Sequence, residues 1–112
     1  MRFIETWTSA TLLAVRDLTP GIREFLLRPD DFAGAPYPVG SHIDVGVTID
    51  GQPQTRSYSL VGEVDPEGLR IAVRRAPDSR GGSQYMWSLA PGARLNITRP
   101  ASLVQLDWTR RQ

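Results

Sequence analysis

The chain has 112 residues, a formal net charge of +1 and 40% hydrophobic residues, which is the composition of one ordinary globular domain. The near-neutral charge gives no reason to expect a nucleic-acid or membrane partner. There is no cysteine, which excludes disulfides, thiolate zinc sites and cysteine-held iron–sulfur clusters within these residues. No apolar run reaches the length of a transmembrane helix and no signal-peptide pattern opens the chain, so a cytoplasmic location is expected.

The first third of the chain predicts two strands and a loop. Residues 8–16 are rich in strand formers, and a turn with Pro and Gly at 17–21 interrupts them. Residues 22–28 form the expected returning strand. Prolines and a glycine over residues 29–38 indicate a loop. Tyr37 in this loop is expected either to be exposed or to cover the mouth of a barrel.

A hairpin is predicted next. Apolar residues alternate with Asp, Gly and Thr over residues 43–49, which is the period of a half-buried strand. Asp50-Gly51 is a strong two-residue turn signal and leads into a second strand at 55–60. His42, the single histidine, precedes the hairpin. It could serve as a base or a metal ligand, but a lone histidine without acidic or cysteine partners favours a structural role.

The second strand of the hairpin carries the residues of most chemical interest. Because side chains alternate along a strand, Arg56 and Tyr58 are expected on one face, and Ser57 and Ser59 on the other. A guanidinium group grips phosphate through paired hydrogen bonds, and a phenol ring stacks on another ring. The pair suits a ligand with an anionic group and a flat ring, and the alternative is an ordinary surface pair of a sheet.

The last third predicts two more strands around one helix. Residues 69–74 and 95–98 alternate as strands do. Residues 83–89 carry a short apolar stripe, with Ser83 as the candidate N-cap of a helix. Pro100 ends the last strand.

A second polar stretch, Arg80-Gly81-Gly82-Ser83, stands just before this helix. The glycines can let backbone N–H groups approach an anion at a helix start. The alternative is a plain turn. The chain contains arginine but no lysine. This indicates either phosphate binding or a compositional bias, and the bias is the simpler interpretation.

Six short strands, one helix and turns rich in Gly and Pro predict an all-β fold, a small antiparallel barrel. We expect one domain over residues 1–112, with its core at about 8–100 and a tail at 101–112. In the tail, Leu103, Leu106 and Trp108 could pack back on the barrel.

Three segments together carry a resemblance to a known family: Arg56-Ser57-Tyr58-Ser59-Leu60, Ile71-Ala72-Val73-Arg74-Arg75 and Arg80-Gly81-Gly82-Ser83. In this order and spacing they resemble the flavin-binding domain of the ferredoxin reductase superfamily. The most similar branch is the reductases of Rieske-type oxygenases, such as phthalate dioxygenase reductase and vanillate demethylase reductase. The resemblance covers roughly residues 8–100. It implies a six-stranded antiparallel Greek-key barrel with one short capping helix.

The resemblance also implies the cofactor-binding residues: Arg56, Ser57, Tyr58, Ser59, Ala72, Val73, Arg74, Arg80, Gly81, Gly82 and Ser83. Arg56 would bind the flavin phosphate, Tyr58 would pack against the ring and ribityl chain, and Ser59 would lie near the reactive edge of the ring. The backbone of 72–74 would face the ring. No catalytic side chain and no metal ligand is predicted.

The implied cofactor is FMN, with FAD as the alternative, because the branch uses FMN and a terminal phosphate suits three convergent arginines, Arg56, Arg74 and Arg80. The implied partners are a pyridine-nucleotide domain, a [2Fe-2S] domain and an oxygenase. The chain has no Gly-x-Gly-x-x-Gly motif and no following α/β domain, so it is expected to be either an excised domain or a protein that stops at the barrel. Arg99-Pro100-Ala101 also replaces the branch's Arg-Asn-x-Phe turn, which affects how a nucleotide domain would dock.

Two rival functions stand beside the flavin domain. A flavin-free barrel could serve as a binding or interaction module. A barrel of the oligonucleotide-binding type is disfavoured by the near-neutral charge and by the absence of a basic, aromatic-studded face.

Overall fold

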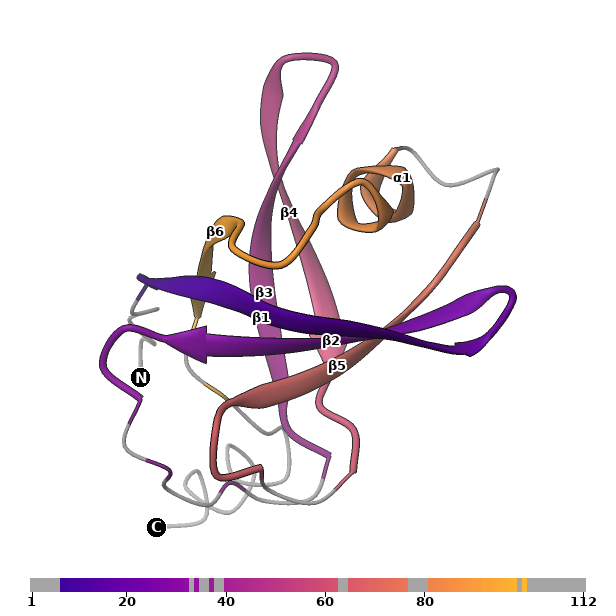
Figure 1. Cartoon of the computed structure of the whole chain (residues 1–112). Coiled ribbons are helices and arrows are strands. Elements are labelled where there is room, and N and C mark those ends of the chain that lie inside the picture. The colour runs from indigo at the N-terminus through magenta and orange to yellow at the C-terminus, as the bar shows by residue number, and fades with distance from the viewer. Residues whose placement is uncertain are drawn as a thin grey trace, which may run out of the picture.

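The computed structural model describes residues 7–32, 34, 37, 40–62, 65–76, 81–98 and 100. It contains β1 (Trp7–Thr19), β2 (Ile22–Pro29), β3 (His42–Ile49), β4 (Gln52–Ser59), β5 (Leu69–Arg74), α1 (Gly82–Trp87) and β6 (Arg94–Thr98) (Figure 1). Every predicted strand is present, and the predicted helix is confirmed with slightly earlier ends. The predicted tail at 101–112 lies outside the described residues.

Turn geometry explains the differences at the strand ends. The predicted turn at 17–21 is shorter, since β1 continues to Thr19. Asp50 and Gly51 both have positive φ angles, of 51° and 77°, as a type I′ turn requires. Pairing therefore begins directly after this turn, and β4 starts at Gln52 rather than at 55.

All six strands belong to one sheet with the order β4-β3-β6-β1-β2-β5, and every pairing is antiparallel. β6, the last strand in sequence, returns to lie between β3 and β1, which is the Greek-key kind of connection that the family resemblance implies. The all-β fold with one short helix is thus confirmed.

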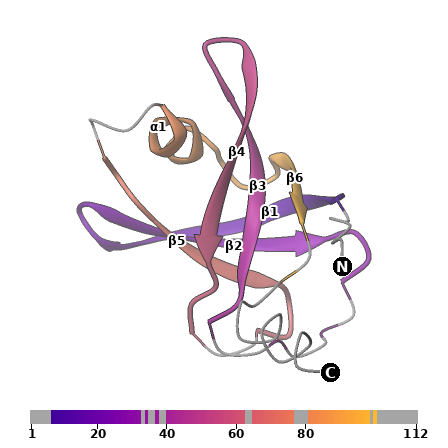
Figure 2. The ribbon, with the colours of Figure 1, turned by 180° about the vertical axis from the view of Figure 1, so that it is seen from behind.

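The sheet does not close into the predicted barrel. Its end strands β4 and β5 meet at an isolated bridge between Leu60 and Ile71, next to a 2.9 Å hydrogen bond from the Val61 N–H to the Arg70 carbonyl. Beyond this bridge the two strands diverge, because the β3–β4 hairpin projects past the rest of the sheet (Figures 1 and 2). The sheet therefore leaves two open edges that face each other.

One hydrophobic core fills the inside of the sheet and includes the helix. Its buried side chains alternate along the strands; they are Ala10, Leu12, Phe25, Leu27, Ile43, Val45, Val47, Leu69, Ile71, Val73, Met86, Leu95 and Ile97. Tyr37 packs against this core and is half-buried, which favours the second of its two predicted placements. In the described part of the chain, no helix is long and apolar enough to cross a membrane.

Candidate functional site

The predicted division of β4 into two faces is confirmed. Arg56 and Tyr58 are half-buried, and Tyr58 packs against the core, whereas Ser57 and Ser59 are exposed. The Ser57 hydroxyl donates a hydrogen bond to the Asp44 carboxylate on β3, which holds it on the outer face. The guanidinium group and the phenol ring therefore share the inner face of an edge strand.

The structure brings the glycines before α1 against the β3–β4 hairpin. A Cβ on Gly82 would lie 2.9 Å from Arg56 Nε, and a Cβ on Gly81 would lie 2.7 Å from Ile49 Cγ2. Gly81 also has a φ of 93°, which residues with a Cβ rarely adopt. Both glycines are thus needed for the close approach, and Gly82 and Arg56 form one corner. Arg80, predicted for the same corner, lies outside the described residues.

Ser83 does not cap the helix, so that prediction is wrong. The N-cap is Gly81, whose left-handed backbone places Ser83 inside the first turn, and among the described residues no side-chain hydrogen bond caps the helix. The buried Ser83 hydroxyl instead accepts a hydrogen bond from the Ala76 N–H at 3.1 Å and donates one to the Ala76 carbonyl at 3.2 Å. It ties the start of α1 to the chain that follows β5. Because α1 spans only Gly82–Trp87, its dipole is small.

The predicted segment on β5 lies on the facing edge. Val73 is buried, Ala72 is half-buried and Arg74 is exposed. The Arg75 N–H donates to the Gly21 carbonyl at 2.8 Å, which fixes the alternation of hydrogen-bonded pairs along the β2–β5 ladder. The backbone groups of Ala72 and Arg74 therefore point away from β2 and toward β4. This orientation is the one that the resemblance implies, and contact with a flavin ring stays a prediction.

Ion pairs separate the arginines into two groups. Four arginines lie beside a carboxylate, in the pairs Arg16–Glu24, Arg23–Asp17, Arg70–Asp65 and Arg94–Asp30. Among the described residues, the other four arginines have no carboxylate at ion-pair distance: Arg28, Arg56, Arg74 and Arg75. Arg56 donates only to the neighbouring Thr55 carbonyl, at 3.0 Å. Positive charge without a carboxylate partner thus stands on both diverging strands and attracts anions, with Arg56 half-buried on the inner face of β4 and Arg74 exposed beside the buried Val73 of β5.

Burial sets the protonation of the Tyr58 phenol. It raises the pKa above the ordinary value of 10.0, and the Arg56 charge opposes this shift. The phenol is therefore neutral near pH 7 and offers a ring and a hydroxyl group. His42 lies across from Ser59 in the β3–β4 register. Within the described residues, no group of three or more His, Cys, Asp or Glu side chains could hold a metal ion.

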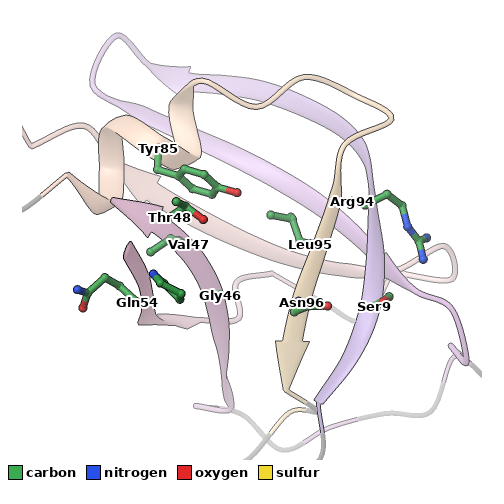
Figure 3. A pocket seen from close by; sticks show the side chains of 10 residues that line it. Ser9, Gly46, Val47, Thr48, Gln54, Tyr85, Arg94, Leu95 and Asn96 are labelled. Carbon is green, nitrogen blue, oxygen red and sulfur yellow. The ribbon is translucent and has the colours of Figure 1, made fainter. Parts of the chain in front are cut away.

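A separate hollow of about 310 Å³ opens between β3 and β6 (Figure 3). These strands pair at Val45–Ile97 and separate toward Thr48 and Arg94. Its lining is mostly uncharged: Ser9, Gly46, Val47, Thr48, Pro53, Gln54, Tyr85, Arg94, Leu95 and Asn96. Asp30 already holds Arg94 through two hydrogen bonds of 2.7 and 2.8 Å. None of the predicted cofactor residues that the structure describes lines this hollow, and the alternation pattern gives no sign of it.

Sequence reasoning also missed two residues that support the site. Ile49 packs against Gly81. The Trp87 indole Nε1 donates a 3.1 Å hydrogen bond to the Val73 carbonyl on β5. Both contacts join separate elements, so no local pattern signals them.

Comparison with known proteins decides the family. Residues 9–105 match the model of the oxidoreductase FAD-binding domain. The chain belongs to this family. It is a flavin domain of the ferredoxin reductase superfamily, as the three sequence segments indicate.

Three similar proteins show how much of each relative this chain matches. The heme-dependent oxidative N-demethylase beta subunit of Ectopseudomonas mendocina is 33% identical over 105 residues, which cover 92% of this chain and 33% of that protein. The carnitine monooxygenase reductase subunit of Escherichia coli is 34% identical over 97 residues, or 82% of this chain and 30% of that protein. The structure of phthalate dioxygenase reductase shares the fold, with a TM-score of 0.69 and 24% identity over 86% of this chain and 30% of that one. This flavin domain thus spans about a third of the length of the curated relatives.

Proposed function

We propose that this domain holds a flavin between the diverging edges of β4 and β5. The observation that carries the proposal is that Arg56 and Arg74, on the two facing strands, have no carboxylate at ion-pair distance among the described residues, with Gly82 in contact with Arg56. The flavin phosphate would lie at this corner, and Arg80 would join it. Tyr58, on the same face as Arg56, would stack on the ring.

The remaining predicted residues would complete the site along the same edges. Ser59 and the backbone of Ala72 and Val73 would lie beside the ring. Ser57 would contribute its backbone, since its hydroxyl is bound to Asp44. Ser83 would act by holding the chain after β5 in place.

FMN is the flavin that we propose. Its terminal phosphate carries about two negative charges near neutral pH, which Arg56, Arg74 and Arg80 together would balance. FAD is the alternative, and the description of the family as FAD-binding supports it. FAD would need further contacts for its adenine half.

The proposed activity is that of a reductase component serving an oxygenase. The reductase subunit and the beta subunit among the relatives support this role. A bound flavin supplies the ability to accept two electrons from NAD(P)H and to release them singly to an iron–sulfur centre. Because the domain spans about a third of its relatives, we propose that pyridine-nucleotide and [2Fe-2S] domains act with it, in cis or in trans.

The proposal is tested by titrating the chain with FMN, FAD and riboflavin and following flavin fluorescence. We expect FMN to bind more tightly than riboflavin, and Arg56→Ala to weaken FMN binding about tenfold or more with little effect on riboflavin. Arg16→Ala is the matched control, because Arg16 is 67% exposed and pairs with Glu24. Equal losses for FMN and riboflavin would contradict the phosphate placement. No binding of any flavin would contradict the function and favour a flavin-free binding module.

A further inference from the structure

The helix α1 is tied to the end of β5 at two points. Ser83 and Trp87 are four residues apart, so they lie on one face of the helix. Ser83 bonds to both backbone groups of Ala76, at 3.1 and 3.2 Å, and the Trp87 indole N–H bonds to the Val73 carbonyl at 3.1 Å. Arg74 lies in the short stretch between these two anchored residues.

Trp87 is itself held on its other side. Asp17, Arg23 and Val73 form one row of cross-strand partners over β1, β2 and β5. The Arg23 guanidinium carbon lies 4.3 Å from the centroid of the Trp87 ring, and Arg23 Nη1 donates to the Trp87 carbonyl at 3.3 Å. Asp17 accepts a 2.6 Å hydrogen bond from Arg23 Nε. The indole is therefore fixed through its ring, its N–H and its backbone.

We infer that Ser83 and Trp87 form a clamp that positions Arg74 for the flavin phosphate. This inference rests on the proposed flavin function. Trp87 acts through the Val73 carbonyl, so it is a positioning residue and not a ligand of the cofactor. An exposed arginine at a strand end has many accessible conformations. Restricting it to one conformation when the ligand binds costs entropy, which lowers the affinity. Anchoring the backbone on both sides of Arg74 removes part of that loss.

A double-mutant cycle on the FMN dissociation constant tests the clamp. Trp87→Phe removes the indole N–H and keeps an aromatic ring beside Arg23. If the clamp acts through Arg74, Trp87→Phe weakens FMN binding about fivefold in the natural background and less than about twofold in an Arg74→Ala background. A merely structural role would give the same factor in both backgrounds and an equal loss for riboflavin, and that result would overturn the inference.

Two further variants complete the experiment. Trp7→Phe is the matched control, because Trp7 is 41% exposed at the start of β1, and we expect no change in FMN binding. If Trp87→Phe does not fold, Ser83→Ala replaces it in the same cycle, with the same dependence on Arg74 expected. A natural chain that binds no flavin would overturn the proposed function and the clamp together. FMN binding without coupling to Arg74 would overturn the clamp alone.

Discussion

The Arg56 side chain lies against Gly82, so that a Cβ on Gly82 would be 2.9, 3.2 and 3.3 Å from Arg56 Nε, Cγ and Cδ. Arg56 comes from the edge strand β4, and Gly82 comes from the first turn of α1. The start of the helix thus supports the stem of the arginine. Arg56 Nη1 donates one hydrogen bond to the Thr55 carbonyl, at 3.0 Å, which leaves the other guanidinium N–H groups for a ligand.

Gly82→Ala should therefore weaken FMN binding while leaving the fold nearly intact. The new methyl group displaces only a flexible side chain, so we expect about a tenfold loss of FMN affinity and a small change in Tm. Riboflavin, which has no phosphate, should lose much less. Gly21→Ala is the control, because nothing lies within 4 Å of a Cβ there and its φ is not in the left-handed region. A large fall in Tm with equal losses for both ligands would contradict this account.

Gly81→Ala should act on stability. Its φ of 93° is strained for any residue with a Cβ, and the methyl group would meet Ile49 Cγ2 at 2.7 Å. We expect the free energy of unfolding to fall by about 2 kcal/mol or more, measured by urea denaturation. Adding Ile49→Ala removes the steric contact but not the strained φ. It should therefore restore the part of the unfolding free energy that the contact costs, but it also removes the apolar surface that Ile49 buries. Wild-type stability in Gly81→Ala would contradict the geometry.

Local periodicity explains which parts of the fold could be predicted. Alternation over 43–49 predicts the first strand of the hairpin, and the Asp50-Gly51 turn signal predicts the second at 55–60. The faces of Arg56 and Tyr58 then follow, because a strand has a period of two. Capping could not be predicted from Ser83, since the left-handed φ of Gly81 decides where the helix begins. The sequence pattern alone would also accept an earlier or later start.

Non-local contacts explain what the sequence did not reveal. The hydrogen bond of Trp87 to Val73 joins residues 14 apart, and that of Arg23 to Trp87 joins residues 64 apart. The divergence of β4 from β5 depends on how two hairpins twist relative to each other, which no single segment encodes. The family resemblance predicts the site residues, and the structure adds that α1 contacts Arg56 and the backbone on both sides of Arg74.

Asp65 should contribute to the acid limb of the stability curve. Its carboxylate accepts hydrogen bonds from the Glu67 N–H at 2.7 Å and from Arg70 Nη2 at 2.5 Å. The Glu67 N–H holds the pKa of this carboxyl below its ordinary 3.8; desolvation opposes the shift, and Arg70 adds to it. A pKa that is lower in the folded state gives stability that is present above the unfolded value and lost as the pH falls through the folded value.

Asp65→Asn removes this charge and should flatten the fall in Tm below a pH of about 3.8. The variant should also be less stable than the natural chain near pH 7. Tm is measured by circular dichroism from about pH 7 to pH 2. Glu67→Gln, a change of equal charge at an exposed neighbour, is the control. Parallel curves for Asp65→Asn and the natural chain would contradict the prediction.

Tyr58 separates ring recognition from phosphate recognition. If its ring stacks on the flavin, Tyr58→Leu should weaken FMN and riboflavin equally, by about tenfold, unlike Arg56→Ala. Tyr58→Phe keeps the ring and should stay within about twofold of the natural affinity.

The pH dependence gives an independent check, because the pKa of Tyr58 lies above 10.0. Tyr58 stays protonated between about pH 6 and pH 9, so its titration should not change the riboflavin affinity in this range. Tyr85→Leu is the matched control, since Tyr85 lines the hollow between β3 and β6 instead. Flavin fluorescence quenching measures the affinity of each variant for FMN and for riboflavin in one assay. Unchanged quenching in Tyr58→Leu would show that the ring of the flavin lies elsewhere, even if Arg56 binds its phosphate.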